Sequence, residues 1–452
     1  MLVVVLGALL LIWPALWNQY PILFSDTGGL IEMSLEPTIG WDKPWIYGPF
    51  LHLFHWRQTL WPCVLAQGLI VSHLLWLVGR RFGPGRHVLL CTLLAVVSAA
   101  PWFVSLLMPD VFTAPVVLCL FLLAFGTLSR RETVWVGLIG TIGIASHLAH
   151  LILAAALIAV VVLCRLWPRW QARPLRTAVP LASALALLML TNIVGLGRPA
   201  ISPNGAVFAL ARLIGDGPGR DYIDRVCPAA GLKLCAWKGR LAQDSDEFLW
   251  DPWGPLWDRR LWGDAFGPVA LAPEASRLVL AIVAAYPLET FEDALVNAGK
   301  QFILVRVGDT LGAKDLDVAV LPKMEHYFPP AEVARYHASR QDRGLLATDE
   351  RPLTPVHLLF LLFGAAGTGL VLIRWRDPTQ GLLALMILAG LAANAAATGA
   401  LSAPHDRYQA RLAWLLLIPP AYAAMAGRTG TIGGVSGARR ATSTGDILTS
   451  AS

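Results

Sequence analysis

Acidic and basic side chains occur in a few short segments that flank the long apolar stretches of this chain. Asp26 and Lys43 follow the first apolar stretch, Asp110 begins the fourth, and Arg407 and Arg411 lie before and at the start of the last. Such cations bind phosphate groups through charge-assisted hydrogen bonds, and a neighbouring carboxylate can remove a proton from a hydroxyl group. Ionised groups close to hydrocarbon are costly and tend to be functional. These residues suit a lipid-linked phosphate substrate at a membrane surface.

Two further side chains map to the same boundary, and each candidate has an ordinary alternative role. Arg57 precedes the second apolar stretch, and His147 lies inside the fifth. Arg57 can simply extend its charged end into water, as interfacial arginines do. Asp110 can cap a helix, and Asp26 can cap a helix that begins at Thr27.

The composition sets the class of protein that must position these side chains. Of the 452 residues, 56% are apolar and only 15% are charged, whereas about 25% are charged in an average soluble protein. A soluble enzyme and a disordered or fibrous chain are therefore excluded. The sequence predicts an all-α polytopic membrane protein. The apolar stretches are 2–17, 58–79, 88–108, 111–128, 134–164, 178–196, 354–373, 380–400 and 411–427.

The stretch 134–164 is too long for one membrane crossing. Its 31 residues would form a helix of about 46 Å, whereas the hydrocarbon core is roughly 30 Å thick. Four arginines follow it, and basic loops favour the cytoplasmic side. A break near Ser146 and His147 gives a hairpin of two short helices and returns these arginines to the cytoplasm. With this hairpin we expect about ten transmembrane helices.

Charge divides the chain into regions. Residues 197–352 hold 21 of the 30 acidic but 18 of the 36 basic residues, although the whole chain carries +6. The basic excess lies in short loops between apolar stretches, which indicates topology rather than a nucleic-acid partner. We expect a transmembrane module at 1–196 with a catalytic first outer loop, a large extracytoplasmic α-rich insert at 197–352, transmembrane helices at 353–428 and a disordered tail at 429–452. Both termini are expected to be cytoplasmic and the insert periplasmic, in a bacterial inner membrane.

Two of the six cysteines, Cys227 and Cys235, lie in the polar insert. If the insert is extracytoplasmic, its compartment is oxidising, and these two cysteines are expected to form a disulfide bond. Neither a CxxC pair nor a histidine partner accompanies them, so a metal site is not expected there.

Several segments, in this order, resemble motifs of the GT-C-type glycosyltransferases, which are membrane enzymes that use polyprenyl-phosphate sugars. F-S-D-T-G-G-L-I-E at 24–32 and D-K-P-W-I-Y-G-P-F-L at 42–51 resemble the first outer loop of that family. M-P-D-V at 108–111 resembles its second outer acid. G-I-A-S-H-L-A-H at 143–150 resembles a segment in which a basic residue is common, and H-D-R-Y-Q-A-R-L at 405–412 resembles its late R-Y motif.

The resemblance implies an inverting glycosyltransferase that moves a sugar from a polyprenyl-phosphate donor to an envelope acceptor, which is a glycan, a lipid or a protein. Asp26 takes the position of the catalytic acid and would act as general base, while Asp110 would orient the acceptor or bind a metal. Thr27 stands where many relatives have a second acid, so a divalent metal is left open as a cofactor. The residues expected to bind the substrates are Lys43, Tyr47, Arg57, His147, Arg407, Tyr408 and Arg411.

Two other functions stay open. A transferase of lipid-linked glycans that resembles the O-antigen ligases would use outer-face arginines in the same way but would not need the early loop that carries Asp26. A non-enzymatic transporter or envelope assembly protein would place charges at the middle of the membrane, where this sequence has almost none.

Overall fold

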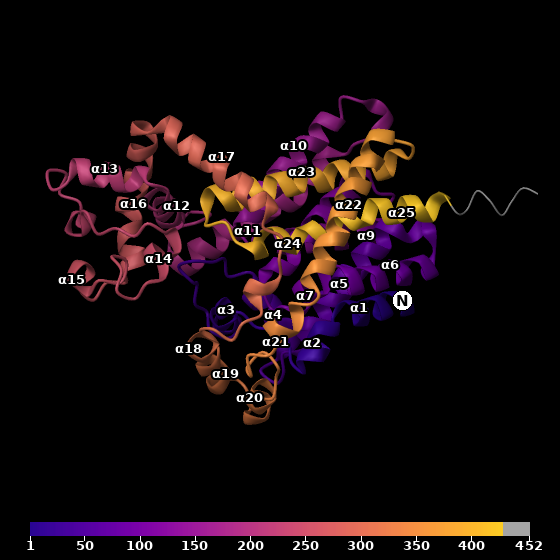
Figure 1. The fold of residues 1–452 in the computed structure, drawn as a ribbon, viewed down its shortest axis with the longest axis horizontal. Coiled ribbons are helices and arrows are strands. Elements are labelled where there is room, and N and C mark those ends of the chain that lie inside the picture. The colour runs from indigo at the N-terminus through magenta and orange to yellow at the C-terminus, as the bar shows by residue number, and fades with distance from the viewer. Residues whose placement is uncertain (428–452) are drawn as a thin grey trace, which may run out of the picture.

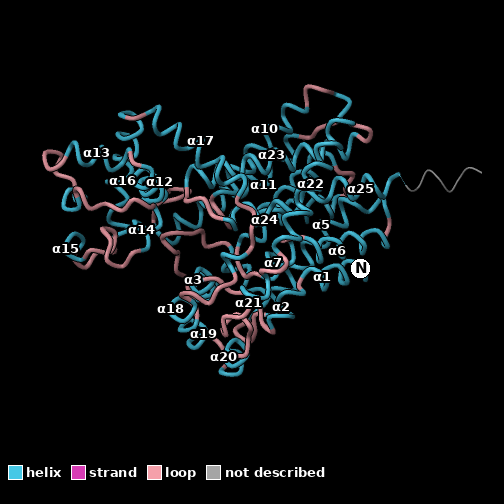
Figure 2. Tube along the Cα trace, in the orientation of Figure 1, coloured by secondary structure: helices cyan, strands magenta, loops and turns pink. Residues whose placement is uncertain are grey.

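The structure, a computed structural model, describes residues 1–427, which form helices joined by turns and loops (Figures 1 and 2). This described part contains no strand, and one isolated bridge joins Ile22 to Leu106. The prediction of an all-α protein is therefore confirmed. The tail predicted at 429–452 lies outside the described residues.

Apolar helices form a bundle (Figure 1). Several begin with proline in the first turn, as at Pro84, Pro174 and Pro378, where the fixed φ of proline favours a helix start. The bundle elements are α1 (Leu2–Leu11), α2 (Trp13–Asn18), α5 (Trp61–Gly79), η1 (Arg80–Phe82), α6 (Pro84–Val97), α7 (Ala100–Ser105), η2 (Pro109–Phe112), α8 (Thr113–Phe125), α9 (Arg130–Ala145), α10 (Ala149–Cys164), η3 (Pro168–Trp170), α11 (Pro174–Leu196), α22 (Thr354–Arg374), α23 (Pro378–Leu401), α24 (Asp406–Ala413), η6 (Trp414–Leu417) and α25 (Ile418–Gly427).

Within residues 1–427, five helices are long and apolar enough to cross a membrane by length and composition. They are α5 with η1, α11, α16 (Gly267–Ala285), α22 and α23. Shorter apolar helices cover Leu2–Leu11, Pro84–Val97, Pro109–Phe125 and Ala149–Cys164. α16 was not among the expected apolar stretches, because its residues were assigned to the polar insert. The membrane character is supported, and the count of about ten crossings stays a prediction.

The helical hairpin predicted within 134–164 is confirmed. α9 ends at Ala145 and α10 begins at Ala149, so the break includes Ser146 and His147. Each helix has 16 residues, which corresponds to about 24 Å. The break therefore places His147 at the tip of the hairpin, as the sequence indicated.

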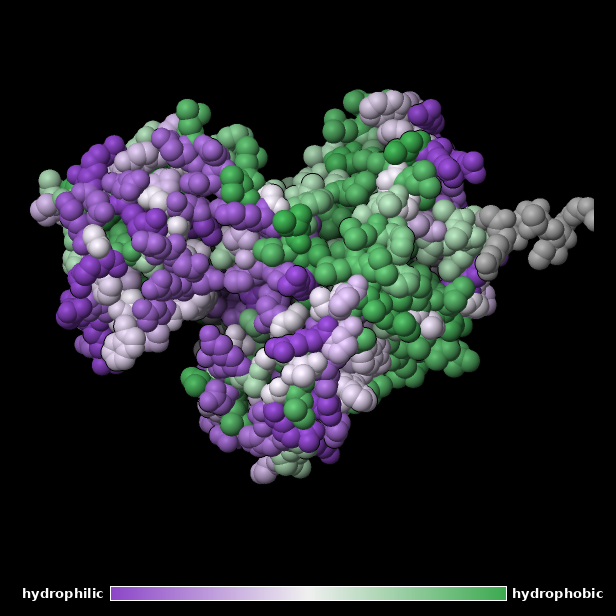
Figure 3. Space-filling model, in the orientation of Figure 1, coloured by the Kyte–Doolittle hydropathy of each residue, from purple (hydrophilic) through white to green (hydrophobic). Residues whose placement is uncertain are grey.

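The basic loops gather at one end of the bundle. Contacts join them to one another, namely the ion pairs Arg80–Glu132 and Arg81–Asp377 and the ring contact Trp170–Trp375. The N-terminus and the end of α25 lie toward the same end (Figure 1). Hydrophobic side chains cover the bundle, and hydrophilic ones gather over the elements at the opposite end (Figure 3).

Residues 197–352 contribute to two polar lobes rather than to one domain (Figure 3). The first lobe, residues 204–286, has its own core, in which Leu210, Phe248 and Leu271 are buried. A disulfide bond in this lobe joins Cys227 to Cys235. Besides α16, the lobe contains α12 (Gly205–Asp216), α13 (Pro218–Val226), η4 (Lys233–Trp237), α14 (Ser245–Trp250) and α15 (Arg259–Trp262).

The second lobe, residues 305–350, shares the core of the bundle. Val320, Met324 and Tyr336 belong to the same buried cluster as the bundle helices. The connecting helix α17 (Pro287–Ile303) packs along α23 and thereby returns the chain to the bundle. The lobe consists of η5 (Gly308–Thr310), α18 (Leu316–Ala319), α19 (Leu321–Tyr327), α20 (Pro330–His337) and α21 (Leu346–Glu350).

The first outer loop lies between the bundle and the lobes (Figure 1) and contains α3 (Ser25–Leu35) and α4 (Tyr47–His55). α3 packs against α18 and α19 of the second lobe. The approach is closest at Gly28, where a Cβ atom would overlap the carbonyl oxygen of Ala319. At the adjacent Gly29, a Cβ atom would meet nothing within 4 Å. Only one of these two neighbouring glycines is therefore required for packing.

We expect Gly28→Ala to destabilise the protein, because the added methyl group would push α3 away from backbone that cannot move aside. Overpacking of this kind costs about 1–3 kcal/mol. Gly29→Ala should leave stability unchanged or raise it by up to about 1 kcal/mol, since alanine favours a helix. The measurement is the apparent unfolding midpoint of each variant in the same detergent, and equal midpoints would contradict the close packing of α3.

Candidate functional site

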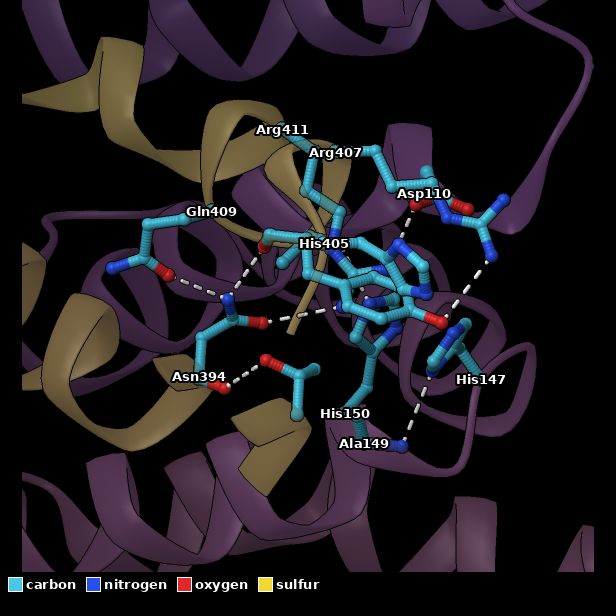
Figure 4. Close-up of polar contacts among 12 residues, drawn as sticks. Asp110, His147, Ala149, His150, Asn394, His405, Arg407, Gln409 and Arg411 are labelled. Atoms are coloured by element: carbon cyan, nitrogen blue, oxygen red, sulfur yellow. Dashed lines mark hydrogen bonds and ion pairs between the residues drawn. The ribbon is translucent and has the colours of Figure 1, made fainter. Parts of the chain in front are cut away.

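Charged side chains from α3, the loop after it, η2 and α24 meet where the bundle adjoins the lobes. Figure 4 shows Asp110, His147, Arg407 and Arg411 lying together. The charges of Lys43, Arg407 and Asp110 all act on the carboxylate of Asp26. The structure thus brings together residues that are more than 380 positions apart in the sequence.

Lys43 is shared between two carboxylates. Its Nζ lies 3.0 Å from Oδ1 of Asp26 and 2.8 Å from Oδ2 of Asp42. The Asp26 side chain keeps 33% of its exposure, which leaves room for a substrate beside it. Burial would raise the pKa of Asp26, but the positive charges of Lys43 and Arg407 outweigh burial and hold that pKa below its ordinary value. Asp26 is therefore a charged carboxylate at neutral pH.

Asp26 does not cap a helix that begins at Thr27. α3 begins at Ser25, and the side chain that hydrogen-bonds to the backbone at the start of this helix is that of Thr27. Its Oγ1 accepts a hydrogen bond from the backbone N–H of Phe24 at 2.9 Å and donates to the carbonyl of Leu107 at 3.1 Å. This arrangement leaves the Asp26 carboxylate to Lys43.

Asp110 and Arg411 form a buried ion pair. Nη1 of Arg411 donates to Oδ1 of Asp110 at 2.9 Å, and the two side chains are 0% and 2% exposed, respectively. Nη2 of Arg411 donates to Oδ1 of Asn394 at 3.2 Å. These bonds join η2, α23 and α24, so the structure gives both charged residues a role in holding helices together.

Arg407 lies one helical turn before Arg411 on α24 and is held differently. Its guanidinium lies over the rings of Phe24 and Tyr408, 4.3 and 4.9 Å from their centroids. Nη2 donates to the Tyr408 hydroxyl at 3.2 Å. Nε and Nη1 are buried and have no hydrogen-bond partner among residues 1–427. Two strong donors of one cation are thus left for an acceptor that residues 1–427 do not supply.

The other predicted residues occupy different positions. His147 accepts a hydrogen bond at Nδ1 from the Ala149 N–H at 3.2 Å and lies close to the charged cluster (Figure 4). Tyr47 is buried, and its hydroxyl donates to Oε1 of Gln67 at 2.5 Å. This hydrogen bond and its burial make Tyr47 part of the packing beneath the site.

The structure does not bring Arg57 into the cluster. Its exposed guanidinium lies 5.9 Å from the ring centroid of Tyr327 in the second lobe. The hydroxyl of Tyr327 donates to Oε1 of Glu36 at 3.2 Å. The expectation that Arg57 binds substrate is therefore not supported by its position, because its guanidinium lies against the second lobe.

Four residues that contact the charged groups were not predicted as site residues: Phe24, Asp42, Asp309 and Asn394. Asn394 was recognisable as a polar residue inside an apolar stretch, where polar groups find polar partners. Asp42 adjoins Lys43 in sequence. Asp309 accepts a hydrogen bond from the backbone N–H of Arg407 at 3.1 Å, and burial raises the pKa of Asp309 to about 6. Nothing in the sequence near Asp309 indicates this contact.

The fit of a divalent metal can be judged from the available ligands. Among residues 1–427, no group of three or more His, Cys, Asp or Glu side chains is arranged to hold a metal ion. Asp26 and Asp42 are both engaged by Lys43, and Asp110 is engaged by Arg411. These residues do not fit a metal, and we derive no step through one.

Comparison with known proteins returns no relative: no protein-family model, curated protein or solved structure matches this chain.

We expect removal of one partner of the Asp110–Arg411 pair to unfold or strongly destabilise the protein. Asp110→Asn and Arg411→Gln each leave the other charge buried without compensation, which costs about 3–5 kcal/mol. The double variant Asp110→Asn/Arg411→Gln should recover part of that loss, because no buried charge remains unpaired. Denaturation midpoints of the three variants provide the test. A single Asp110→Asn variant as stable as the unmodified protein would show that the pair is not structural.

Proposed function

We propose that this protein is an inverting membrane glycosyltransferase that uses a polyprenyl-phosphate sugar donor. The observation that carries the proposal is the free hydrogen-bonding capacity of Arg407, whose Nε and Nη1 are buried without a partner among residues 1–427. Each of these free donors can make a charge-assisted hydrogen bond to a phosphate oxygen. The Asp26–Lys43 pair beside it supplies a base and a second cation. The sequence resemblance supports the same reading.

The proposed reaction exchanges one bond for another. The acceptor hydroxyl gives its proton to a carboxylate oxygen of Asp26, and the hydroxyl oxygen forms a bond to the anomeric carbon of the sugar. At the same time, the bond between that carbon and the phosphate oxygen breaks, and its electron pair leaves with the polyprenyl phosphate. Arg407 stabilises the negative charge that grows on this phosphate. Attack opposite the leaving group inverts the anomeric centre.

Asp110 and Arg411 act indirectly in this scheme. Their mutual ion pair at 2.9 Å occupies Oδ1 of Asp110 and Nη1 of Arg411, and the one donor of Arg411 without a partner among residues 1–427 is Nε. They set the position of α24, and α24 carries Arg407. The earlier assignment of Asp110 to acceptor orientation and of Arg411 to phosphate binding is thereby replaced with a positioning role for both.

The proposed arrangement in the membrane has about ten crossings, with both termini cytoplasmic and both lobes periplasmic in a bacterial inner membrane. Support comes from the basic loops, which gather at the end opposite the polar lobes (Figures 1 and 3). Basic loops favour the cytoplasmic side. The charged cluster would then face the periplasm.

Alkaline phosphatase fused at Gly254 of the first lobe or Gly344 of the second lobe should be active, because both positions lie in turns of the polar lobes. A fusion at Gly83, in the basic loop between η1 and α6, should be inactive. Enzyme activity in cells expressing each fusion is the measurement. An inactive fusion at either lobe would overturn the proposed orientation.

Variants of Arg407 and Asp26 should separate donor binding from turnover. Arg407→Ala should weaken binding of polyprenyl-phosphate sugars roughly 10- to 150-fold, since hydrogen bonds to charged groups contribute about 1.5–3 kcal/mol. Asp26→Asn should keep donor affinity and lower turnover by about 10²–10⁴, because asparagine cannot accept the proton. Donor affinity and initial rates are measured on the same preparations with a panel of polyprenyl-phosphate sugars.

The matched control is Arg306→Ala, which removes an exposed arginine near α24 whose backbone N–H alone contacts Asp406. Its donor affinity should equal that of the unmodified protein. The proposal fails if Arg407→Ala behaves like this control, or if Asp26→Asn turns over at the full rate.

A further inference from the structure

A cavity of about 560 Å³ lies between the first outer loop, the end of α11 and the first lobe. The volume falls within the range of about 300–1,000 Å³ that is usual for small-molecule sites. One of its lining residues is Lys43, whose Nζ lies 3.0 Å from Oδ1 of the proposed base Asp26. Its walls include Gly29, Trp41, Lys43, Arg198, Asn204 and Phe266.

Asn204, one of the residues that line this cavity, carries a buried acceptor without a partner. It is 4% exposed, and its Nδ2 donates to the carbonyl of Trp41 at 3.0 Å. Because a carbonyl oxygen can only accept, the atom of the Asn204 amide that faces Trp41 must be the nitrogen. The other atom of the amide is therefore the acceptor Oδ1. Oδ1 is buried and has no hydrogen-bond partner among the described residues. A ligand that donates a hydrogen bond would satisfy it.

Aromatic rings form another part of the cavity. Trp41 belongs to the first outer loop, but its ring packs into the first lobe, 5.1 Å from the ring of Phe208 and 6.4 Å from that of Phe266. The Phe266 side chain is 49% exposed. Flat apolar faces of this kind pack against the C–H faces of ligands that also carry polar edges.

Three of the four charged wall residues, Glu32, Asp42 and Lys43, are held in ion pairs, whereas the exposed Arg198 has no ion pair among residues 1–427. Lys43 is held by Asp26 and Asp42, and Glu32 is held by Lys323 at 2.6 Å. A lipid chain would not fit among these groups, since a charge beside hydrocarbon loses its hydration. A highly charged ligand would find few free counter-charges. Hydroxyl groups, which both donate and accept, match paired carboxylates and a free amide oxygen.

We propose that this cavity binds the acceptor of the transferase and that the acceptor is a carbohydrate, an inference that rests on the proposed function. A hydroxyl group of the sugar donates to Oδ1 of Asn204, and a C–H face packs on the aromatic wall. The hydroxyl that reacts lies at the Lys43 end of the cavity, beside Asp26. The first lobe thereby selects the acceptor, while the bundle end holds the donor phosphate.

Gly29 allows the cavity to be filled without disturbing the fold. It lines the cavity, and a Cβ atom there would meet nothing within 4 Å. Gly29→Trp therefore places an indole in the cavity. The matched control is Gly299→Trp on α17, which is also helical, also open around its Cβ atom and outside the cavity. Phe266→Ala is a second test variant, and its partial exposure makes it compatible with folding.

The experiment measures saturation-transfer difference NMR of the protein in lipid nanodiscs with di- and trisaccharides of glucose, galactose, mannose and N-acetylglucosamine. At least one sugar should bind to the unmodified protein and to Gly299→Trp with equal affinity. Gly29→Trp should weaken that binding at least tenfold, and Phe266→Ala should weaken it as well. The proposal is wrong if none of these sugars binds, or if both cavity variants bind as tightly as the control.

Donor binding in the same preparations distinguishes failure of this inference from failure of the proposed function. Gly29→Trp should bind polyprenyl-phosphate sugars normally, because Arg407 does not line the cavity and Lys43, which does, is held by Asp26 and Asp42 before the reaction. A protein that binds sugars in the cavity but no polyprenyl-phosphate donor would overturn the transferase and keep the carbohydrate site. A protein that binds the polyprenyl-phosphate donor but no sugar in the cavity would overturn the carbohydrate site alone.

Discussion

The buried ion pair between Asp110 and Arg411 is the interaction on which the rest of the site depends. Moving either charge out of water costs several kcal/mol, and that cost is offset only by good geometry and further hydrogen bonds. Asn394 supplies such a bond to Arg411. Because Arg407 lies one turn before Arg411 on the same helix, the pair fixes where the guanidinium of Arg407 lies relative to α3. A helix held less firmly would let Arg407 satisfy its free donors elsewhere.

The proposed acceptor cavity and the proposed donor end of the site are linked through the first outer loop. Trp41 is anchored in the core of the first lobe by its ring and by the bond from Asn204, and Asp42 and Lys43 follow directly. Any shift of the lobe is therefore passed to Lys43, which is bonded to Asp26. Gly28 fixes the other side of the loop by direct contact of α3 with α18. The base is thus positioned from both lobes, although it belongs to neither.

The sequence predicted the all-helical class, the broken hairpin at Ser146 and His147, and the charged residues that meet at the site, because hydropathy, helix length and charge placement are local properties. It did not predict that 197–352 is divided between a lobe with its own core and a lobe that shares the core of the bundle, since this division depends on the packing of α17 against α23. It also misplaced Arg57, because the direction of α4 depends on tertiary packing. The partners Phe24, Asp309 and Asn394 come from distant segments, and no local pattern joins them to Arg407 and Arg411.

The charges of the site explain how the proposed reaction could proceed close to hydrocarbon. Three carboxylates, Asp26, Asp42 and Asp110, stand against three cations, Lys43, Arg407 and Arg411. These six charges sum to zero. A polyprenyl-phosphate sugar is a phosphodiester with one negative charge, so the site with the donor bound carries one net negative charge, which lies on the phosphate beside Arg407. When the sugar leaves, the phosphate gains a second negative charge, and at that moment the acceptor proton neutralises Asp26. Lys43, which lies 3.0 Å from Asp26, then loses one of its two partners and is free to balance the phosphate. The total charge therefore stays constant through the step, so the reaction adds no further net charge in a medium where ions are costly.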